Sequence, residues 1–195
     1  MEAGGIILAG GKSSRFQGNK ALAEVASQRL IDRIILILSS VLPRLILVTN
    51  SPSDYKGVGA DIVTDIIPGK GPLSGIHAGL VASPYSLNFV TACDMPFINA
   101  ALVEYLVKRA CSSVDAVVPV VKGYPEPLAA VYRKTCIPFI EQSLLAERYK
   151  VTDFYNRVRV AYVTEQELAP LIEVNTFFNI NTREDLKKAF PEEGS

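Results

Sequence analysis

The sequence predicts an α/β sandwich with a mostly parallel central sheet, and two observations lead to this fold class. Apolar, β-branched runs alternate with helix-like stretches from one end of the chain to the other. The strand-like runs are continuously apolar, as expected when helices cover both faces of a mostly parallel sheet through right-handed crossovers. With 195 residues, 49% hydrophobic and 21% charged, the chain is long enough to bury a substantial core, and we expect one domain.

The first half alternates four strands with two helices. Strands are predicted in its apolar runs: Gly5–Ala9, Arg44–Thr49, Ala60–Thr64 and Leu87–Cys93. A helix is predicted over Arg29–Val41, because apolar side chains repeat there at helical spacing. A second helix opens at Pro72 and continues through Ala82, since proline is tolerated in a first helical turn.

The second half begins in the same way and then changes. A helix is predicted over Ala100–Cys111 and a strand over Asp115–Val121. Beyond these we expect another strand over residues 125–133 (PEPLAAVYR), a helix over Thr135–Glu147 and a strand over Arg157–Thr164. A terminal helix over Thr182–Phe190 would be capped by Thr182, and residues 191–195 would be a frayed tail.

The bulk composition excludes several classes of function. Twenty basic residues balance twenty acidic ones, so no global field favours nucleic acid or an anionic membrane, and a small anion is the favoured ligand. The most hydrophobic stretch, Leu30–Val48, is interrupted by charged residues. Its charge-free part is too short for a membrane helix, which needs about 20 apolar residues. No secretory segment is seen, which predicts a cytoplasmic protein.

The three cysteines point to the same compartment. Cys93, Cys111 and Cys136 are odd in number, widely spaced and embedded in apolar stretches. We therefore expect three buried free thiols in a reducing environment, and neither a disulfide framework nor a zinc site.

A loop after the first strand combines two glycines with three cations. Gly10 and Gly11 let main-chain N–H groups approach an anion, while Lys12, Arg15 and Lys20 add positive charge. The pattern predicts a phosphate cradle, and an ordinary turn with a solvated basic face is the alternative. A P-loop is excluded because Ile6 stands where its first glycine belongs, and adjacent glycines do not match the dinucleotide fingerprint.

Polar side chains also follow the other predicted strands, at the edge where an open α/β sheet binds ligands. Asp94 follows a buried strand, where its carboxylate would suit Mg²⁺ or would cap the next helix, with the two readings about even. Asp65 offers a second carboxylate for metal, its waters or a ribose hydroxyl. The Asn50 amide matches a base edge or serves a turn. Together they favour a metal and phosphate site.

Three further features border this edge. The stretch Pro68–Gly75 would fold close against a ligand and then present helix N–H groups to it. His77, the single histidine, lies among apolar residues and is expected in the core or on the surface, so histidine-dependent triads are poorly supported. Cys93 is interpreted as a small buried hydrophobe.

Six segments, in register over nearly the whole chain, resemble the molybdenum cofactor guanylyltransferases. They are LAGGKSSRFQGNKAL (8–22), DIIPGKGPLSGI (65–76), CDMPF (93–97), PEPLAAVY (125–132), ERYKVTDF (147–154) and FFNINTREDL (177–186). The resemblance implies a three-layer α/β/α, Rossmann-like nucleotidyltransferase fold in one domain over residues 1–195. Its N-terminal half would bind nucleotide, and its C-terminal part would form the pterin side of the cleft.

The resemblance also implies a reaction. Molybdopterin, or its molybdenum-loaded form, would attack the α-phosphorus of Mg·GTP through its terminal phosphate, releasing pyrophosphate and forming a guanine dinucleotide cofactor. Proteins that insert molybdenum or mature molybdoenzymes are implied as partners, alongside the two small-molecule substrates.

Site residues carry over by position. The main chain of Leu8, Ala9, Gly10 and Gly11 would wrap the nucleotide, Lys20 would contact phosphate, and Asn50 and Asp65 would contact the nucleoside. Asp94 would bind nucleotide and Mg²⁺, and Lys20 and Arg15 would join it in stabilising charge during transfer. The last two matched positions, on the pterin side of the cleft, are Asn179 and Asn181.

The first segment departs from the family pattern at two positions. Where the family usually has Arg-Met-Gly-x-Asp-Lys, this chain has Gln17 for the first glycine and Asn19 for the acid, with Arg15 and Lys20 kept. Asn19 brings no charge, which puts the role of an acid beside the lysine in doubt, and Gln17 demands a less permissive backbone.

Three other readings stay open at this point. A cytidylyltransferase acting on the same cofactor shares most of the segments. A catalytically silent nucleotide or pterin carrier would not need Lys20, Asp65 and Asp94 together. A nucleotide-sugar glycosyltransferase would ordinarily need an Asp-x-Asp pair, which the sequence around Asp94 lacks.

Overall fold

The computed structural model describes residues 2–10, 20–25 and 28–191. Within these ranges, eight strands form one sheet in the order β10-β7-β9-β6-β1-β4-β5, with β8 paired to β7 off this path. Their bounds are β1 Gly4–Leu8, β4 Leu45–Val48, β5 Asp61–Val63, β6 Leu87–Ala92, β7 Ala116–Val121, β8 Tyr124–Pro125, β9 Ala129–Arg133 and β10 Val160–Val163. A separate antiparallel pair joins β2 (Glu24–Val25) to β3 (Gln28–Arg29).

The sheet is mostly parallel, as predicted. Strand β1 pairs in parallel with β4 and β6, β4 with β5, and β7 with β10. The exception within the main order is β9, which runs antiparallel to both β6 and β7. Its direction follows from a two-residue hairpin turn at Lys122 and Gly123, both with positive φ (51° and 80°), which joins β7 to β8 and sends the chain back.

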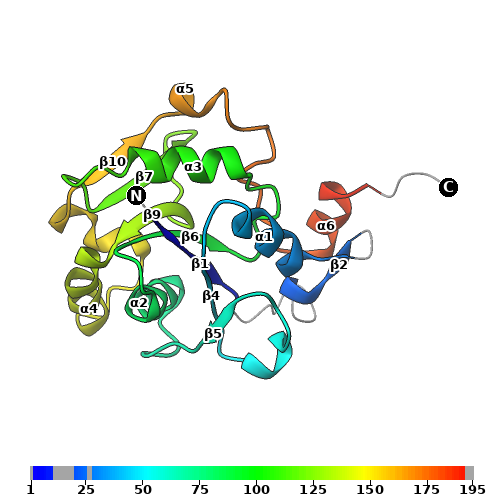
Figure 1. Cartoon of the computed structure of the whole chain (residues 1–195), viewed down its shortest axis with the longest axis horizontal. Helices are drawn as coiled ribbons and strands as arrows, with labels where there is room; N and C mark the ends of the chain where they lie inside the picture. Colours follow the sequence, from blue (N-terminus) through cyan, green and yellow to red (C-terminus); the bar gives the residue numbers. More distant parts are fainter. Residues whose placement is uncertain (1, 11–19, 26–27, 192–195) are drawn as a thin grey trace.

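Helices cover both faces of the sheet, giving the predicted three layers (Figure 1). The α-helices are α1 Leu30–Ser39, α2 Pro72–Ala82, α3 Ala100–Arg109, α4 Ile137–Leu145, α5 Glu165–Leu168 and α6 Arg183–Ala189. Short 3₁₀ helices are η1 Lys20–Leu22, η2 Pro52–Tyr55, η3 Lys134–Cys136 and η4 Val151–Arg157.

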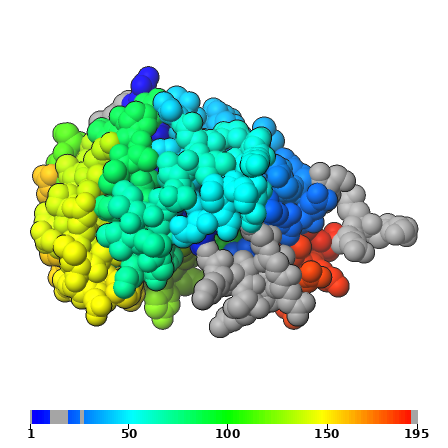
Figure 2. Space-filling view, turned by 90° about the horizontal axis from the view of Figure 1, so that it is seen from below, coloured from blue at the N-terminus to red at the C-terminus, as the bar shows by residue number. Residues whose placement is uncertain are grey.

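Successive side chains of a strand point to opposite faces of the sheet and pack in different cores. Ile7 of β1 packs in one core with apolar residues of α1, α3 and α5, whereas Ile6 and Leu8 pack in the other with α2, α4 and η4. Figure 2 shows the second face from outside, with α2 and α4 side by side. The continuously apolar strands of the sequence are therefore explained by burial on both sides.

The C-terminal helix packs beyond the sheet. Leu30 at the start of α1 and Ile180 are both fully buried in a third small core, to which α6 adds partly buried apolar side chains. The ring of Phe190 stacks on Phe97 at 5.1 Å between centroids, and the guanidinium of Arg33 lies 5.0 Å from its centre. These contacts bring α6 beside the β2–β3 pair (Figure 1).

Several predicted boundaries were wrong, each for a local reason. The strand expected over residues 125–133 begins only at Ala129. The strand expected over Arg157–Thr164 begins at Val160, because the preceding segment forms η4 and buries Phe154 and Tyr155. The helix expected over Thr135–Glu147 is split into η3 and α4, and it ends before Glu147, whose φ is 56°. The expected tail at 192–195 lies outside the described residues.

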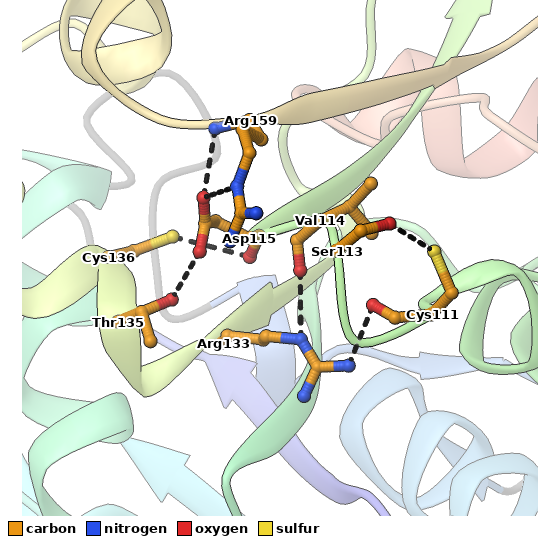
Figure 3. Close-up of polar contacts among 8 residues, drawn as sticks. All are labelled: Cys111, Ser113, Val114, Asp115, Arg133, Thr135, Cys136 and Arg159. Atoms are coloured by element: carbon orange, nitrogen blue, oxygen red, sulfur yellow. Dashed lines mark hydrogen bonds and ion pairs between the residues drawn. The ribbon is translucent and has the colours of Figure 1, made fainter.

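A polar network ties β7, β9 and β10 together at the amino end of β7 (Figure 3). Asp115 accepts hydrogen bonds from Arg159, through its main-chain N at 3.0 Å and its Nε at 3.2 Å, and from Thr135 Oγ1 at 2.8 Å. Arg133 donates to the main-chain oxygens of Val114, Ala110 and Cys111.

The cysteines are free, and the expectation of three buried thiols is corrected at one of them. Cys93 and Cys136 are buried, but Cys111 is exposed just after α3, where its Sγ lies 2.9 Å from Ser113 Oγ. Cys111 lies two residues beyond Arg109, the last residue of α3, where the chain is exposed to solvent.

Candidate active site

The carboxyl ends of four parallel strands are level with one another. In the pairing register Leu8 lies beside both Val48 and Ala92, and Val48 lies beside Val63. Two residues beyond this level, each of the four strands is followed by a residue that the sequence analysis identified. In the order of the strands across the sheet, these residues are Asp65, Asn50, Gly10 and Asp94. The four predicted site segments therefore share one edge of the sheet, where open α/β folds bind ligands.

Three distant segments meet at one side chain of this edge. Lys20, at the start of η1, places its Nζ 2.5 Å from Asp94 Oδ2 and 3.2 Å from Asn181 Oδ1. The lysine and aspartate side chains are 20% and 14% exposed, so their charges are partly desolvated. Lys20 and Asn181 are 161 positions apart in the sequence, and their contact joins the two ends of the chain.

Asp94 is held rigidly and has one oxygen to spare. Its main-chain oxygen accepts from Ile180 N at 2.9 Å, and the N–H of Cys93 bonds to Leu8 O at 3.0 Å. With Oδ2 on Lys20, Oδ1 is buried without a hydrogen-bond partner in the described part of the chain. A buried carboxylate oxygen without a donor is costly unless a ligand completes it, which fits a magnesium ligand.

The alternative role of Asp94 as a helix cap is wrong. Helix α3 begins at Ala100, and Asn99 caps it by accepting from Leu102 N at 2.9 Å. Asp94 therefore does not cap the next helix.

Asn50 and Asp65 hold each other in place. Asn50 Nδ2 donates to Asp65 Oδ2 at 2.9 Å, and Asp65 N donates to Asn50 Oδ1 at 3.3 Å. Because the amide bridges two strand ends instead of closing its own turn, its position is fixed from both sides. This pair presents hydrogen-bonding groups beside the end of β1.

The glycine-rich stretch before α2 approaches the same place. Gly71 precedes Pro72, the first residue of α2, with φ of 72°, a conformation that glycine adopts without strain. A Cβ added to Gly75 would lie 3.1 Å from Leu8 Cδ2 and 3.7 Å from Asp65 Oδ1. The start of α2 therefore packs against β1 and the Asp65 carboxylate, at the edge of the sheet where the sequence predicted a ligand.

His77 and Cys93 are both buried, in agreement with the sequence analysis. His77 is buried on α2, and its Nε2 lies 3.0 Å from Glu141 Oε1 on α4, in the contact between the two helices. Burial and the neighbouring Asp94 raise the pKa of the Cys93 thiol to about 12. Cys93 is therefore a neutral, buried side chain and not a nucleophile.

Other predicted site residues are placed less fully. Gly11 and Arg15 lie outside the described residues, as do Gln17 and Asn19. Ala9 is fixed by its N–H bond to Val48 O at 2.9 Å. Asn179 is exposed, and among the described residues its side chain donates to the main-chain oxygen of Phe177 at 3.4 Å. The structure thus brings Asn181, but not Asn179, to Lys20.

Sequence reasoning missed a hollow next to this site. A cavity of about 680 Å³ is walled by the β7–β8 turn, residues 165–174 and Phe177–Phe178, and Glu126 lines it. The only signal was the PEPLAAVY segment, which carried the family resemblance without a role for its glutamate. A second cavity of about 710 Å³ lies between Pro72 and residues 149–156.

Comparisons with known proteins place the chain in a family. A family model described as a MobA-like NTP transferase domain matches residues 5–161. The chain belongs to the MobA-like NTP transferase family.

Relatives agree with this assignment over almost the whole chain. A protein of Pelotomaculum thermopropionicum named probable molybdenum cofactor guanylyltransferase is 43% identical over 97% of this chain and 92% of its own. A molybdenum cofactor guanylyltransferase of Desulfosudis oleivorans is 40% identical over 95% of this chain and 93% of its own.

Solved structures of family members and of neighbouring enzymes share the fold. Molybdopterin-guanine dinucleotide biosynthesis protein A from Archaeoglobus fulgidus superposes with a TM-score of 0.82, at 28% identity and 96% coverage of each chain. A 2-C-methyl-D-erythritol 4-phosphate cytidylyltransferase from Thermus thermophilus matches with a TM-score of 0.69 at 20% identity, over 97% of each chain, which is a likeness of fold. The MobA-like chain is a nucleotidyltransferase, and none of its described helices is long and apolar enough to cross a membrane.

Proposed function

We propose that this nucleotidyltransferase is a molybdenum cofactor guanylyltransferase. It transfers GMP from GTP to the terminal phosphate of molybdopterin, releases pyrophosphate and forms the guanine dinucleotide cofactor. The observation that carries the proposal is the meeting of Lys20, Asp94 and Asn181 at one point, between the strand ends of the N-terminal half and the C-terminal segment. The names of the relatives support the choice of substrates.

GTP binds over the ends of β5, β4 and β1. Asn50 and Asp65 contact the nucleoside, because their mutual hydrogen bonds hold two polar side chains beside β1. The main chain of Leu8, Ala9, Gly10 and Gly11 wraps the nucleotide, and Gly11 belongs to this proposal by sequence alone. The N–H groups at the start of α2 face the same edge and favour negative charge.

Mg²⁺ fits Asp94. Among the described residues no group of three or more His, Cys, Asp or Glu side chains converges, so a metal would rest on Asp94 together with substrate phosphates. The buried Oδ1 without a partner supplies a hard oxygen of the kind this ion prefers. When bound, the metal neutralises phosphate charge and polarises the phosphoryl oxygens.

The protein's own groups align two anions that repel each other. Lys20 holds a phosphate through its ammonium group, for which Asp94 is the resident counter-ion. Asn181 orients the lysine from the acceptor side, and its amide can donate to a phosphate oxygen. An oxygen of the molybdopterin phosphate attacks the α-phosphorus, and the bond to the pyrophosphate oxygen breaks. Arg15, which belongs to this proposal by sequence alone, joins Lys20 in stabilising the charge that builds during transfer.

The wider setting is inferred from the same assignment. The chain acts as one domain, with the acceptor bound on its C-terminal side, near Asn179 and Asn181. We place it in the cytoplasm, with proteins that insert molybdenum or mature molybdoenzymes as partners.

One incubation tests the proposed function. The purified protein is mixed with molybdopterin, Mg²⁺ and one nucleoside triphosphate at a time, and the dinucleotide product is separated and quantified. We expect product with GTP. Preferential use of CTP would make the protein a cytidylyltransferase, and absence of product with every nucleotide would contradict the enzyme assignment.

A further inference from the structure

The cavity beside the site is lined by aromatic residues and by four charged ones, which are Glu126, Glu165, Glu173 and Lys122. Its volume is about 680 Å³, within the range of small-molecule sites. Tyr124 on β8 and Phe177 and Phe178 of the C-terminal segment contribute rings to its lining. Such walls suit a flat heteroaromatic ring, because ring stacking adds to the burial of apolar surface.

Glu126 lines this cavity without a partner. Its main chain is fixed, since Glu126 N donates to Pro119 O at 2.8 Å and Glu126 O accepts from Ala129 N at 3.1 Å. No hydrogen bond or ion pair reaches its carboxylate from the part of the chain that the structure describes. Partial burial raises the pKa of this carboxyl, which is the cost that donors on a ligand would remove.

The topology sets Glu126 next to the reacting centre. Ala129 of β9 pairs antiparallel with Thr91 of β6. Glu126 comes three residues before Ala129, and Asp94 comes three residues after Thr91. Because the two strands are antiparallel neighbours, both residues lie beyond the same edge of the sheet. The phenylalanine wall is also close to this centre in the chain, because Ile180, whose N–H bonds to Asp94 O, lies two residues after Phe178.

The same topology separates the cavity from the nucleoside side. Asn50 and Asp65 follow β4 and β5, on the other side of β1 from Asp94, whereas Glu126 precedes β9. A molecule in the cavity would therefore approach the Lys20 and Asp94 pair from the side opposite to the nucleoside.

We propose that this cavity binds the pterin ring of the acceptor, with the Glu126 carboxylate accepting hydrogen bonds from the ring N3–H and the 2-amino group. The inference rests on the proposed function and names the acceptor subsite within it. A carboxylate matches this edge because its two oxygens accept two parallel N–H donors. Guanine carries the same aminopyrimidinone edge, so the experiment must separate pterin from guanine.

The first measurement compares Glu126→Gln with the wild-type protein in steady-state turnover. We expect the KM for molybdopterin to rise about 10- to 100-fold, the cost of a lost charge-assisted hydrogen bond, with the KM for GTP unchanged. Glu104→Gln, at an exposed position on α3, is the matched control and leaves both values unchanged. An unchanged molybdopterin KM in Glu126→Gln would overturn the inference.

One further variant and one further substrate locate the ring. Lys150→Ala alters the cavity between Pro72 and residues 149–156, and we expect no effect on the molybdopterin KM. A rise there, without one in Glu126→Gln, would move the pterin to that cavity. ITP lacks the 2-amino group of GTP. If Glu126 instead bound guanine, the variant would raise the KM for GTP, and more than it raises the KM for ITP, which keeps only the N1–H donor; this would also overturn the inference.

A binding measurement separates this inference from the proposed function. The fluorescence of 6-hydroxymethylpterin reports its binding to the full-length protein without any turnover. We expect at least a 10-fold weaker dissociation constant in Glu126→Gln than in the wild type or in Glu104→Gln. Glu126-dependent binding of this pterin with no dinucleotide formed would contradict the proposed function alone. Turnover with pterin binding that ignores Glu126 would contradict the inference alone.

Discussion

At the scale of single residues, Asp94 shows how a functional side chain differs from a structural one. One of its oxygens is paired with Lys20, and the other is buried with no donor in the described ranges. A structural carboxylate such as Asp115 instead has donors on both oxygens. The spare oxygen indicates that Asp94 is completed by a ligand and not by the fold.

Replacing Asp94 by Asn should therefore affect activity far more than stability. We expect turnover to fall at least about 100-fold, because a charge at the reacting centre is lost. The free energy of unfolding should change by about 1 kcal/mol or less, since removal of a carboxylate with an unsatisfied oxygen offsets the lost ion pair. Turnover and urea unfolding are measured together, with the exposed Asp61→Asn as control. Wild-type turnover in Asp94→Asn would remove this residue from the mechanism.

The cysteines give a second prediction at this scale. The hydrogen bond with Ser113 lowers the pKa of exposed Cys111, whereas burial raises the pKa of Cys93 and Cys136 to about 12. Because the thiolate is the reactive form, a thiol reagent at neutral pH should modify one cysteine rapidly in the folded protein and the other two only on unfolding. Cys111→Ser should remove the rapid phase. Two rapid phases in the wild type would contradict the burial described for the other cysteines.

Residue patterns predicted the strand-end groups but not their contacts. Asn50, Asp65 and Asp94 were identified because each directly follows an apolar run, which is a local signal. The contact between Lys20 and Asn181 carries no such signal, since it depends on how the C-terminal segment packs against Leu30 and Asp94. Glu126 was missed because nothing in its own segment shows that a cavity lies beside it.

At the scale of elements, helix α2 depends on glycine at two positions for different reasons. A Cβ at Gly79 would lie 2.5 Å from Ile6 Cγ2, inside the core of one face. At Gly75 the nearest atom is the far end of the Leu8 side chain, 3.1 Å away, and the Asp65 carboxylate is 3.7 Å away. The first glycine serves packing and the second serves the site.

Alanine at these positions should separate the two effects. We expect Gly79→Ala to destabilise the protein by about 1–3 kcal/mol through overpacking. Gly75→Ala should leave stability within about 1 kcal/mol, because alanine favours the helix, while the KM for GTP rises several-fold. Urea unfolding and GTP titration of turnover measure both quantities. A GTP effect confined to Gly79→Ala would contradict the role given to the start of α2.

The network around Asp115 joins three strands and makes their docking depend on pH (Figure 3). Burial pushes the pKa of Asp115 upward, but hydrogen bonds from Arg159 and Thr135 outweigh it, so the folded-state pKa lies below the ordinary value of 3.8. A depressed folded pKa gives stability that is present above the unfolded pKa and is lost as the pH falls through the folded one.

Asp115→Asn should test this network. At neutral pH we expect a loss of about 1–3 kcal/mol, because the amide has one accepting oxygen for the donors that faced two. The difference from the wild type should shrink as the pH falls below about 4, where the unfolded aspartate becomes protonated. Urea unfolding at a series of pH values measures it. A difference that stays constant down to the acid range would assign the loss to packing.

The direction of β9 could not be predicted from the residues of the strand itself. The apolar run of β9 would suit a strand of either direction, and its antiparallel course was decided by the left-handed Lys122, a residue that seldom adopts this conformation. By contrast, Pro72 and Thr182 mark helix starts through their own chemistry, and both were predicted correctly.

At the scale of the whole molecule, the active site is closed by the two ends of the chain. The sheet places Asn50, Asp65 and Asp94 along one edge, and the segment proposed to bind the acceptor follows the last strand. Ile180 bonds to the main chain of Asp94, and Asn181 bonds to Lys20. In the proposed function, nucleotide binding and acceptor positioning would therefore be carried by different parts of the chain that meet at Lys20.

Asn181 and Asn179 form a matched pair for testing this closure. Asn181→Ala removes the contact with Lys20, so we expect turnover to fall about 10-fold or more while GTP with Mg²⁺ still raises the midpoint of thermal unfolding. Asn179→Ala removes only a contact with the neighbouring Phe177 main chain, and we expect the rate at saturating substrates to stay within about twofold. Equal losses of rate in the two variants would mean that the segment acts through its packing, and loss of the GTP effect in Asn181→Ala would mean that both substrates depend on the C-terminal end.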